Sequence, residues 1–193
     1  MSIKPVNPAL DRIFNAALRS AVSNETIVPE YTAEGVPESG KAIHAMWLSA
    51  KERDTPFRVL NTANDGHLLY FSEGTNLLYR FIHDLDHAVA YEVGRGTTRY
   101  EDELYLNCLM ARRVYLHAIK SHDSLTALAV FFAVYHDTVG QVKFYKEHGT
   151  FLVNQRAHTV QLLNECTGMH FVNHGMLRPA YQVMINYLNE CGV

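Results

Sequence analysis

The feature that most constrains this fold is an apolar run from Leu125 to Tyr135, inside a predicted helix from Ser124 to about His148. Apolar residues cover nearly every face of the first half of that helix, so none of its faces suits water. We expect a central, buried helix, because the run is shorter than the ~20 residues of a membrane span. A homo-oligomer interface is the alternative if the run is exposed in the monomer. The expected core residues are Leu125, Leu128, Val130, Phe131, Phe132 and Val134.

Length and composition fit one globular domain that covers residues 1–193. Hydrophobic residues make up 48% of the chain and charged residues 19%, which is typical of a protein with a buried core and excludes a disordered chain. The formal net charge is -3, so no basic excess favours a nucleic acid as the main partner. We expect a small-molecule substrate.

Patterns along the chain predict a mostly α fold, a single-domain bundle of about six helices. Helix starts follow from Asn7-Pro8, from Ser72 as an N-cap, and from the capping box Thr98 to Glu101. Besides the central helix, the predicted helices cover about 8–23, 41–52, 73–93, 99–122, 150–166 and 178–189.

A small β-hairpin is predicted near residues 56–71. Asn64-Asp65-Gly66 is a typical hairpin turn, and apolar segments flank it on both sides. Residues 24–40, with two prolines and two glycines, are predicted to form a long loop.

The three cysteines, Cys108, Cys166 and Cys191, form no CxxC pair and leave an odd thiol. The polar N-terminal sequence does not resemble a signal peptide. We therefore expect a cytoplasmic protein in a reducing compartment.

The motif His83-Asp84-Leu85-Asp86-His87 is the clearest candidate for a functional site. In a helix, His83 and His87 project from one face about one turn apart and can share one divalent metal ion. Asp84 and Asp86 can add oxygen ligands or accept hydrogen bonds from the imidazoles. The motif predicts a metal site, with zinc favoured and manganese or iron as alternatives.

A third ligand is expected from the acids Glu101, Asp102 and Glu103, which begin the next predicted helix. A short glycine-containing turn should fold that helix back antiparallel to the first. Glu101 has a rival role as the N3 residue of the capping box, so we favour Glu103, with Asp102 as an alternative. Two histidines and one carboxylate leave a coordination position for water or substrate, as in catalytic metal sites.

A solvated polar face is the alternative explanation for the motif. On a helical wheel the two histidines lie opposite an apolar stripe that includes Phe81, Leu85 and Val89. Two histidines and two carboxylates in a pocket are costly unless a cation lies among them, which favours the metal.

His136-Asp137 is a second candidate site, because it follows the apolar run and should lie deep in the fold. A hydrogen-bonded core histidine is the more common role at such a position. Gly140, one turn later, would let a neighbouring helix or a ligand approach closely. Asp84, His136 and Asp137 are the candidate catalytic residues.

His83-Asp84-x-x-His87 followed by acidic residues resembles the HDxxH zinc motif of a ubiquinone-biosynthesis protein family. That family is all-helical, and its motif places a glutamate after eleven further residues. In this chain that position is Arg99, and the nearest acids are Glu101 to Glu103. The resemblance covers about twenty residues and implies a similar metal site, without implying the same substrate.

The order His44, His83-Asp84, Asp137 resembles the motif of HD-domain phosphohydrolases, which are helical metal enzymes that hydrolyse phosphate esters. That resemblance implies that His44 and Asp137 approach the His83-Asp84 pair. His87 stands where related nucleotidases often carry an acid, and the predicted hairpin interrupts the helices usual in that family.

These observations favour a metal-dependent enzyme, with a hydrolase of phosphate-containing small molecules as the first reaction class. The metal would polarise a water or a substrate oxygen, and Asp84 or a neighbouring acid would act as general base. The alternatives are a metal-dependent lyase or decarboxylase and a non-catalytic interaction or regulatory protein.

Overall fold

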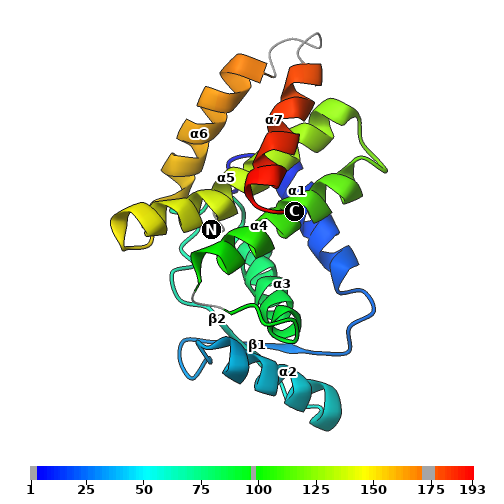
Figure 1. The fold of residues 1–193 in the computed structure, drawn as a ribbon, viewed down its shortest axis with the longest axis vertical. Helices are drawn as coiled ribbons and strands as arrows, with labels where there is room; N and C mark the ends of the chain where they lie inside the picture. The colour runs from blue at the N-terminus through cyan, green and yellow to red at the C-terminus, as the bar shows by residue number, and fades with distance from the viewer. Residues whose placement is uncertain (1–3, 97–98, 171–176) are drawn as a thin grey trace.

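The computed structural model describes residues 4–96, 99–170 and 177–193, and it confirms a mostly α fold. Helices dominate the described residues, and the strands are short. Figure 1 shows the two strands with one helix at one end of the molecule and the last two helices at the other. The elements are α1 (Pro8–Ala21), β1 (Pro29–Thr32), α2 (Gly40–Arg53), β2 (Phe57–Leu60), α3 (Glu73–Tyr91), α4 (Tyr100–Ala118), α5 (Ser124–His148), α6 (Gln155–His170) and α7 (Leu177–Glu190).

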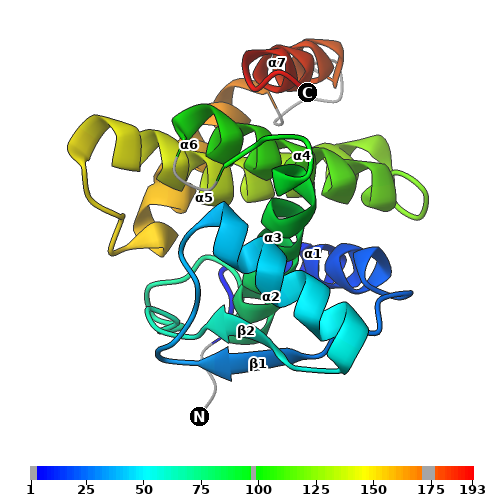
Figure 2. The ribbon, with the colours of Figure 1, turned by 60° about the horizontal axis from the view of Figure 1, so that its bottom comes forward.

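Helix α5 is the centre of the fold, as its apolar run predicts. Its expected core residues are buried except Leu125, which is half-buried. Helix α4 packs along it, and α1, α6 and α7 cover other parts of it (Figure 2). By length and composition α5 could cross a membrane, with a mean hydropathy of 1.2 over its most apolar window. However, 72% of that window is buried inside the protein, as in a core helix.

Local capping explains where three of the helices begin or end. The Asn7 side chain accepts hydrogen bonds from two amides of the first turn of α1. Ser72 caps α3 through the Thr75 amide, and Asp123 caps α5. Gly149 ends α5 with a φ of 69°, a left-handed conformation that glycine adopts without strain.

The predicted β-hairpin is wrong. Strand β2 instead pairs in parallel with β1, with Pro29 opposite Phe57, in the segment predicted to be a loop. Helix α2 supplies the crossover that parallel strands require. The expected hairpin turn instead leads into α3. The Gly66 amide donates to the carboxylate of Glu73, the first residue of that helix, and so fixes the turn against the helix start. Residues 67–71 form turns and no strand.

The predicted capping box at the start of α4 is also wrong. The N-cap residue is Arg99, which makes no side-chain capping bond, and Thr98 lies outside the described residues. The predicted boundaries differ from the observed ones by a few residues elsewhere: α4 ends at Ala118, and α6 begins at Gln155. The first turn of α4 is nevertheless acidic, as its sequence indicates.

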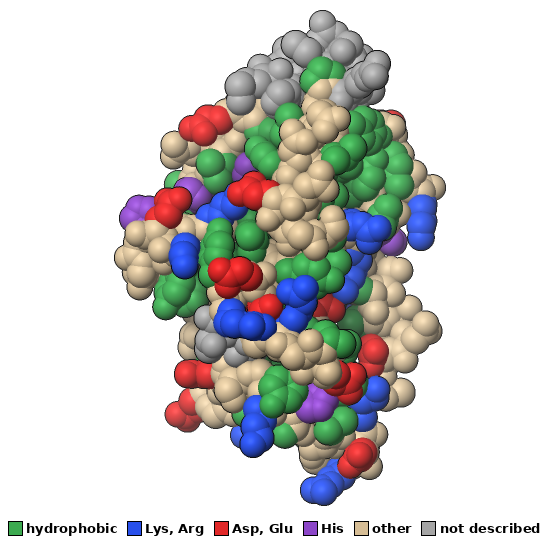
Figure 3. Space-filling view, in the orientation of Figure 1, with side chains coloured by type: hydrophobic (Ala, Val, Ile, Leu, Met, Phe, Trp, Pro, Cys, Tyr) green, Lys and Arg blue, Asp and Glu red, His purple; other side chains and the backbone are tan. Residues whose placement is uncertain are grey.

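The surface in Figure 3 carries acidic and basic side chains interspersed with apolar ones. Charges of both signs lie around the middle of this face. That distribution agrees with the small net charge of the chain.

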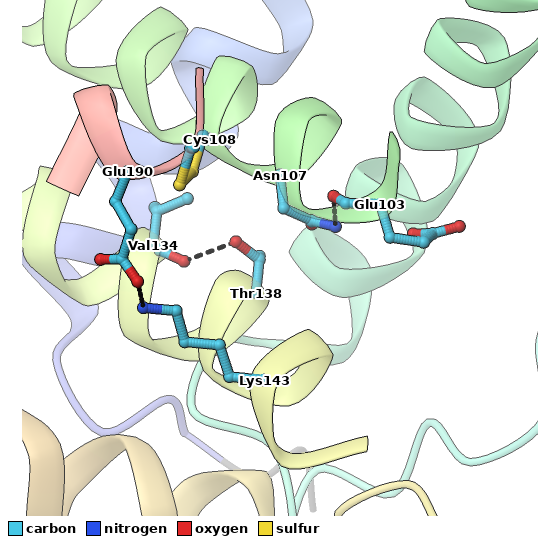
Figure 4. Close-up of a disulfide and its surroundings, with 8 residues drawn as sticks. Glu103, Asn107, Cys108, Val134, Thr138, Lys143 and Glu190 are labelled. Atoms are coloured by element: carbon cyan, nitrogen blue, oxygen red, sulfur yellow. Dashed lines mark hydrogen bonds and ion pairs between the residues drawn. A yellow bond between two sulfur atoms is a disulfide. The ribbon is translucent and has the colours of Figure 1, made fainter. Parts of the chain in front are cut away.

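A disulfide joins Cys108 on α4 to Cys191, just after α7 (Figure 4). The two Cα atoms lie 6.1 Å apart, although 83 positions separate them in the sequence. Cys166 is buried and free. No spacing motif predicts this pair, because the contact depends on how α7 packs.

Candidate metal centre

His83 and His87 lie one turn apart on α3 with their ring centroids 4.5 Å from each other. Other helices cover the side of α3 that carries them. The motif is therefore not a solvated polar face, the alternative explanation for it. His87 is only 3% exposed, and Asn76 on the same side is also buried. Val89, which the helical wheel placed in the apolar stripe, is half exposed.

Glu103 reaches both histidines from the first turn of α4. Its two carboxylate oxygens lie 2.9 Å from His87 Nε2 and 3.4 Å from His83 Nε2. One ligand atom from each of the three residues lies within 4.8 Å of the other two. Ligands about 2.0–2.1 Å from a tetrahedral zinc ion stand roughly 3.3 Å apart, so small side-chain movements would fit an ion among them.

The other two acids of this turn have different surroundings. Glu101 is exposed. Asp102 is buried and accepts hydrogen bonds from Arg95, Arg99 and the Gly96 amide. Glu103 is therefore the acid of this turn that the fold brings to the histidines.

Electrostatics favours opposite charges within this cluster. Burial by itself raises the pKa of Glu103, but hydrogen bonds and charge from His83 and His87 lower it to about 2. Burial by itself lowers the pKa of His83, yet the Glu103 carboxylate, with Asp84 and Asp86, raises it above its ordinary value. The Glu103 carboxylate thus stabilises the positive charge of a protonated His83, and it would stabilise a bound metal ion in the same way.

Asp84 lies beside the cluster without belonging to it. Burial raises the pKa of Asp84 to about 6, although the charges of His83 and His87 act in the opposite direction. Among the described residues, no hydrogen bond or ion pair of a side chain holds its carboxylate. Its carboxylate is therefore free to take up a proton. Asp86, by contrast, forms a bidentate ion pair with Arg113 on α4.

Two residues that the sequence analysis missed support the histidines. Asn107 Nδ2 lies 3.2 Å from His83 Nε2 and donates to the Glu103 backbone carbonyl (Figure 4). The Tyr79 hydroxyl donates to Asn107 Oδ1, and its ring packs against His83. Helical spacing could have identified both, because Tyr79 precedes His83 by one turn and Asn107 follows Glu103 by one turn.

The other predicted site residues lie outside this cluster. His44 hydrogen-bonds the Ala88 carbonyl through Nδ1, at 2.9 Å, and packs against aromatic rings. Burial raises the pKa of Asp137 to about 7, although the hydrogen bond that it accepts from Thr159 acts in the opposite direction. His136, its neighbour on α5, lines a separate cavity. The ligand cluster thus combines the HDxxH motif with Glu103, without His44 or Asp137.

Two nitrogens and one carboxylate are a donor set that zinc and related divalent metals accept. One feature departs from most metal-binding histidines, whose second nitrogen donates to an acceptor. His87 Nδ1 is buried and has no hydrogen-bond partner among the described residues. Comparison of the chain with protein-family models, with curated proteins and with solved structures gives no match.

Proposed function

We propose that His83, His87 and Glu103 bind one divalent metal ion, with zinc favoured over manganese and iron. The observation that carries this proposal is the convergence of two imidazoles and a carboxylate, from two helices, whose ligand atoms all lie within 4.8 Å of one another. Placing these groups together in a partly buried position is costly unless a cation balances them.

The reaction we propose is metal-dependent hydrolysis of a phosphate-containing small molecule. The bound ion would supply Lewis acidity at a water or substrate oxygen. Asp84 would accept the proton of that water, while the Tyr79 ring packs against His83 and keeps its orientation. His83 and Glu103 are 14% and 26% exposed, which leaves the cluster an opening toward solvent.

Cations near the start of α4 support an anionic substrate. Arg95 and Arg99 share the single carboxylate of Asp102, and Lys146 lies over the Tyr100 ring. These side chains place positive charge on the turn that also carries the acids Glu101 and Glu103, and an anionic substrate would pair with the arginines.

Metal content tests the first part of the proposal. Protein purified without a nickel column or chelators should carry close to one divalent ion per chain by mass spectrometry. His83→Ala combined with His87→Ala should remove it, and Glu103→Gln should reduce it. The matched control is His117→Ala, a histidine on α4 outside the cluster, which should keep the ion. Metal-free wild-type protein would contradict the site.

Turnover tests the second part. With zinc restored, the wild-type protein should hydrolyse a phosphate ester such as p-nitrophenyl phosphate. Asp84→Asn should lower the rate about 100-fold or more, the usual contribution of a general base, while metal content stays unchanged. Metal binding without any phosphate-ester hydrolysis would remove the reaction and leave the metal site.

A further inference from the structure

A second cavity lies on the other part of the molecule, between α5, α6 and α7, with a volume of about 250 Å³. Tyr135 and His136 from α5 line it, facing His158 and Leu162 from α6 and Tyr187 from α7. The absence of a side chain at Gly140 leaves space in this cavity. A Cβ atom there would contact Leu162 Cδ1 and His158 Nε2, at 3.5 and 3.6 Å. None of the three residues of the metal cluster lines it.

Two buried polar atoms on the wall of this cavity lack partners. His136 is 8% exposed, and its Nε2 atom makes no hydrogen bond with the described residues. The Tyr135 hydroxyl likewise has no partner of ordinary hydrogen-bond geometry among the described residues; burial raises its pKa, and the charge of the nearby Lys143 and a longer hydrogen bond from it act in the opposite direction. Buried polar groups are nearly always paired, so two unpaired atoms on one cavity indicate a missing ligand group.

The charges around the cavity favour an uncharged ligand. Lys143 is already paired with Glu190 at 2.9 Å. Burial lowers the pKa of His136 to about 4, with Lys143 and His158 acting in the same direction, so the ring is neutral near pH 7. A neutral imidazole and a tyrosine hydroxyl each offer hydrogen bonds without offering charge.

The remaining walls favour an aromatic ring. Tyr187 stacks on Tyr135 with ring centroids 4.6 Å apart, and Phe144 and Leu162 also line the cavity. A cavity of about 150 Å³ is enough for benzene, so this one has room for a single substituted ring. A hydroxyl on that ring can both donate and accept, which matches the two unpaired atoms.

We propose that this cavity is a binding site for a small monocyclic phenol, whose hydroxyl bonds to His136 Nε2 and the Tyr135 hydroxyl while its ring packs against Tyr187. The site is separate from the metal cluster and does not depend on the proposed hydrolase. Its ligand is defined by the shape and hydrogen-bonding capacity of the cavity.

Paired titrations of the full chain with p-cresol and toluene test the site. Both probes have one ring and a methyl group, and only p-cresol has a hydroxyl. By calorimetry we expect p-cresol to bind with a Kd near about 1 mM or tighter, in the range accessible to such small ligands. Toluene should bind about three- to tenfold more weakly, the value of a hydrogen bond to a neutral group.

Two variants assign the preference to named atoms. His136→Phe and Tyr135→Phe each keep a ring and remove one polar atom, and each should reduce the preference for p-cresol over toluene. His117→Phe is the matched control and should leave it unchanged. A preference that survives both substitutions would overturn the proposal.

The wild-type protein alone also decides the question, should either variant fold poorly. Nuclear Overhauser contacts should join the p-cresol ring to the Leu162 methyl groups. Contacts to Leu116 instead, which lines a separate groove between α1, α3 and α4, would place binding elsewhere and overturn the site. Equal affinities for the two probes, or no binding of either, would mean that the cavity holds water or is a nonspecific void.

Discussion

The two histidine-containing regions differ in how their polar atoms are satisfied. At the metal cluster, His83 and His87 face a carboxylate, and the pKa of His83 is raised. At the α5–α7 cavity, His136 faces aromatic rings, has an unpaired Nε2 atom, and has a lowered pKa. The same side chain thus has its pKa raised beside a carboxylate in one region and lowered by burial among aromatic rings in the other.

This difference follows from which helices meet. An acidic first turn of α4 is adjacent to the HDxxH face of α3, so opposite charges come together. The half of α5 that carries His136 packs against α6 and α7, whose neighbouring residues include Leu162 and Tyr187. Only a neutral imidazole is stable among such groups.

The largest expected effect is on the cavity side. Phe132 is fully buried, and its ring packs against those of His136 and Tyr187. Phe132→Ala should lower the free energy of unfolding by about 3–5 kcal/mol, measured by chemical denaturation, because it leaves a void in the core. The metal content should not change. Phe151→Ala, at a residue that is 69% exposed, is the control and should have little effect.

Asp137 should respond to pH in the opposite way from a paired carboxylate. Its pKa in the folded protein, about 7, exceeds the ordinary value, so the folded state binds more protons between about pH 4 and 7. Stability is therefore lost as the pH rises through that window. Asp137→Asn should raise the free energy of unfolding by up to about 4 kcal/mol at pH 8 and by little at pH 4. A variant that is less stable at pH 8 would contradict a buried carboxylate with a raised pKa.

Glu103→Gln should break the charge complementarity of the metal cluster. In metal-free protein, the lowered pKa of Glu103 adds stability above about pH 4.5, which is lost toward pH 2. The raised pKa of His83 adds stability below its ordinary value, which is lost as the pH rises. The variant should therefore lose most stability near pH 5–6, by about 1.5–3 kcal/mol. An equal loss at pH 9 would show that the contact is not ionic.

The smallest effect is expected for His136→Phe. This change removes an unpaired polar atom, so stability at pH 7 should change by less than about 1 kcal/mol. Because the pKa of His136 is lowered, the wild-type protein loses stability as the pH falls from about 6.5 to 4, and the variant should lose less. His87→Phe, which breaks a paired contact, is the comparison and should cost more. An equal loss in the free energy of unfolding for both variants would contradict the proposed difference between the two regions.

Features set by local sequence were predictable. Ser72 caps α3 and the i, i+4 spacing aligns its two histidines, and both depend only on neighbouring residues. The short turn before α4 predicts an acid of its first turn near the histidines, but the capping box that favoured Glu103 over Glu101 is not the reason for the contact, because the N-cap residue is Arg99. The burial of Phe131 and Phe132 followed from the continuous apolar run.

Features that join distant segments were not predictable. The β1–β2 pairing depends on the packing of α2, and a turn-like Asn64-Asp65-Gly66 favoured a hairpin instead. The α5–α7 cavity depends on residues from three helices, so no spacing along the chain marks it.

The disulfide between Cys108 and Cys191 has a mechanical consequence. It closes a covalent loop that contains α5, α6 and α7, together with the whole phenol-sized cavity. A pulling force applied near the two termini passes from the first half of the chain directly through the sulfur–sulfur bond. The looped segment, 83 residue steps or about 280 Å of contour length at roughly 3.4 Å per step, bears no load until that bond is reduced. Under tension the oxidised protein would therefore separate His83 and His87 from Glu103 before it opens the cavity.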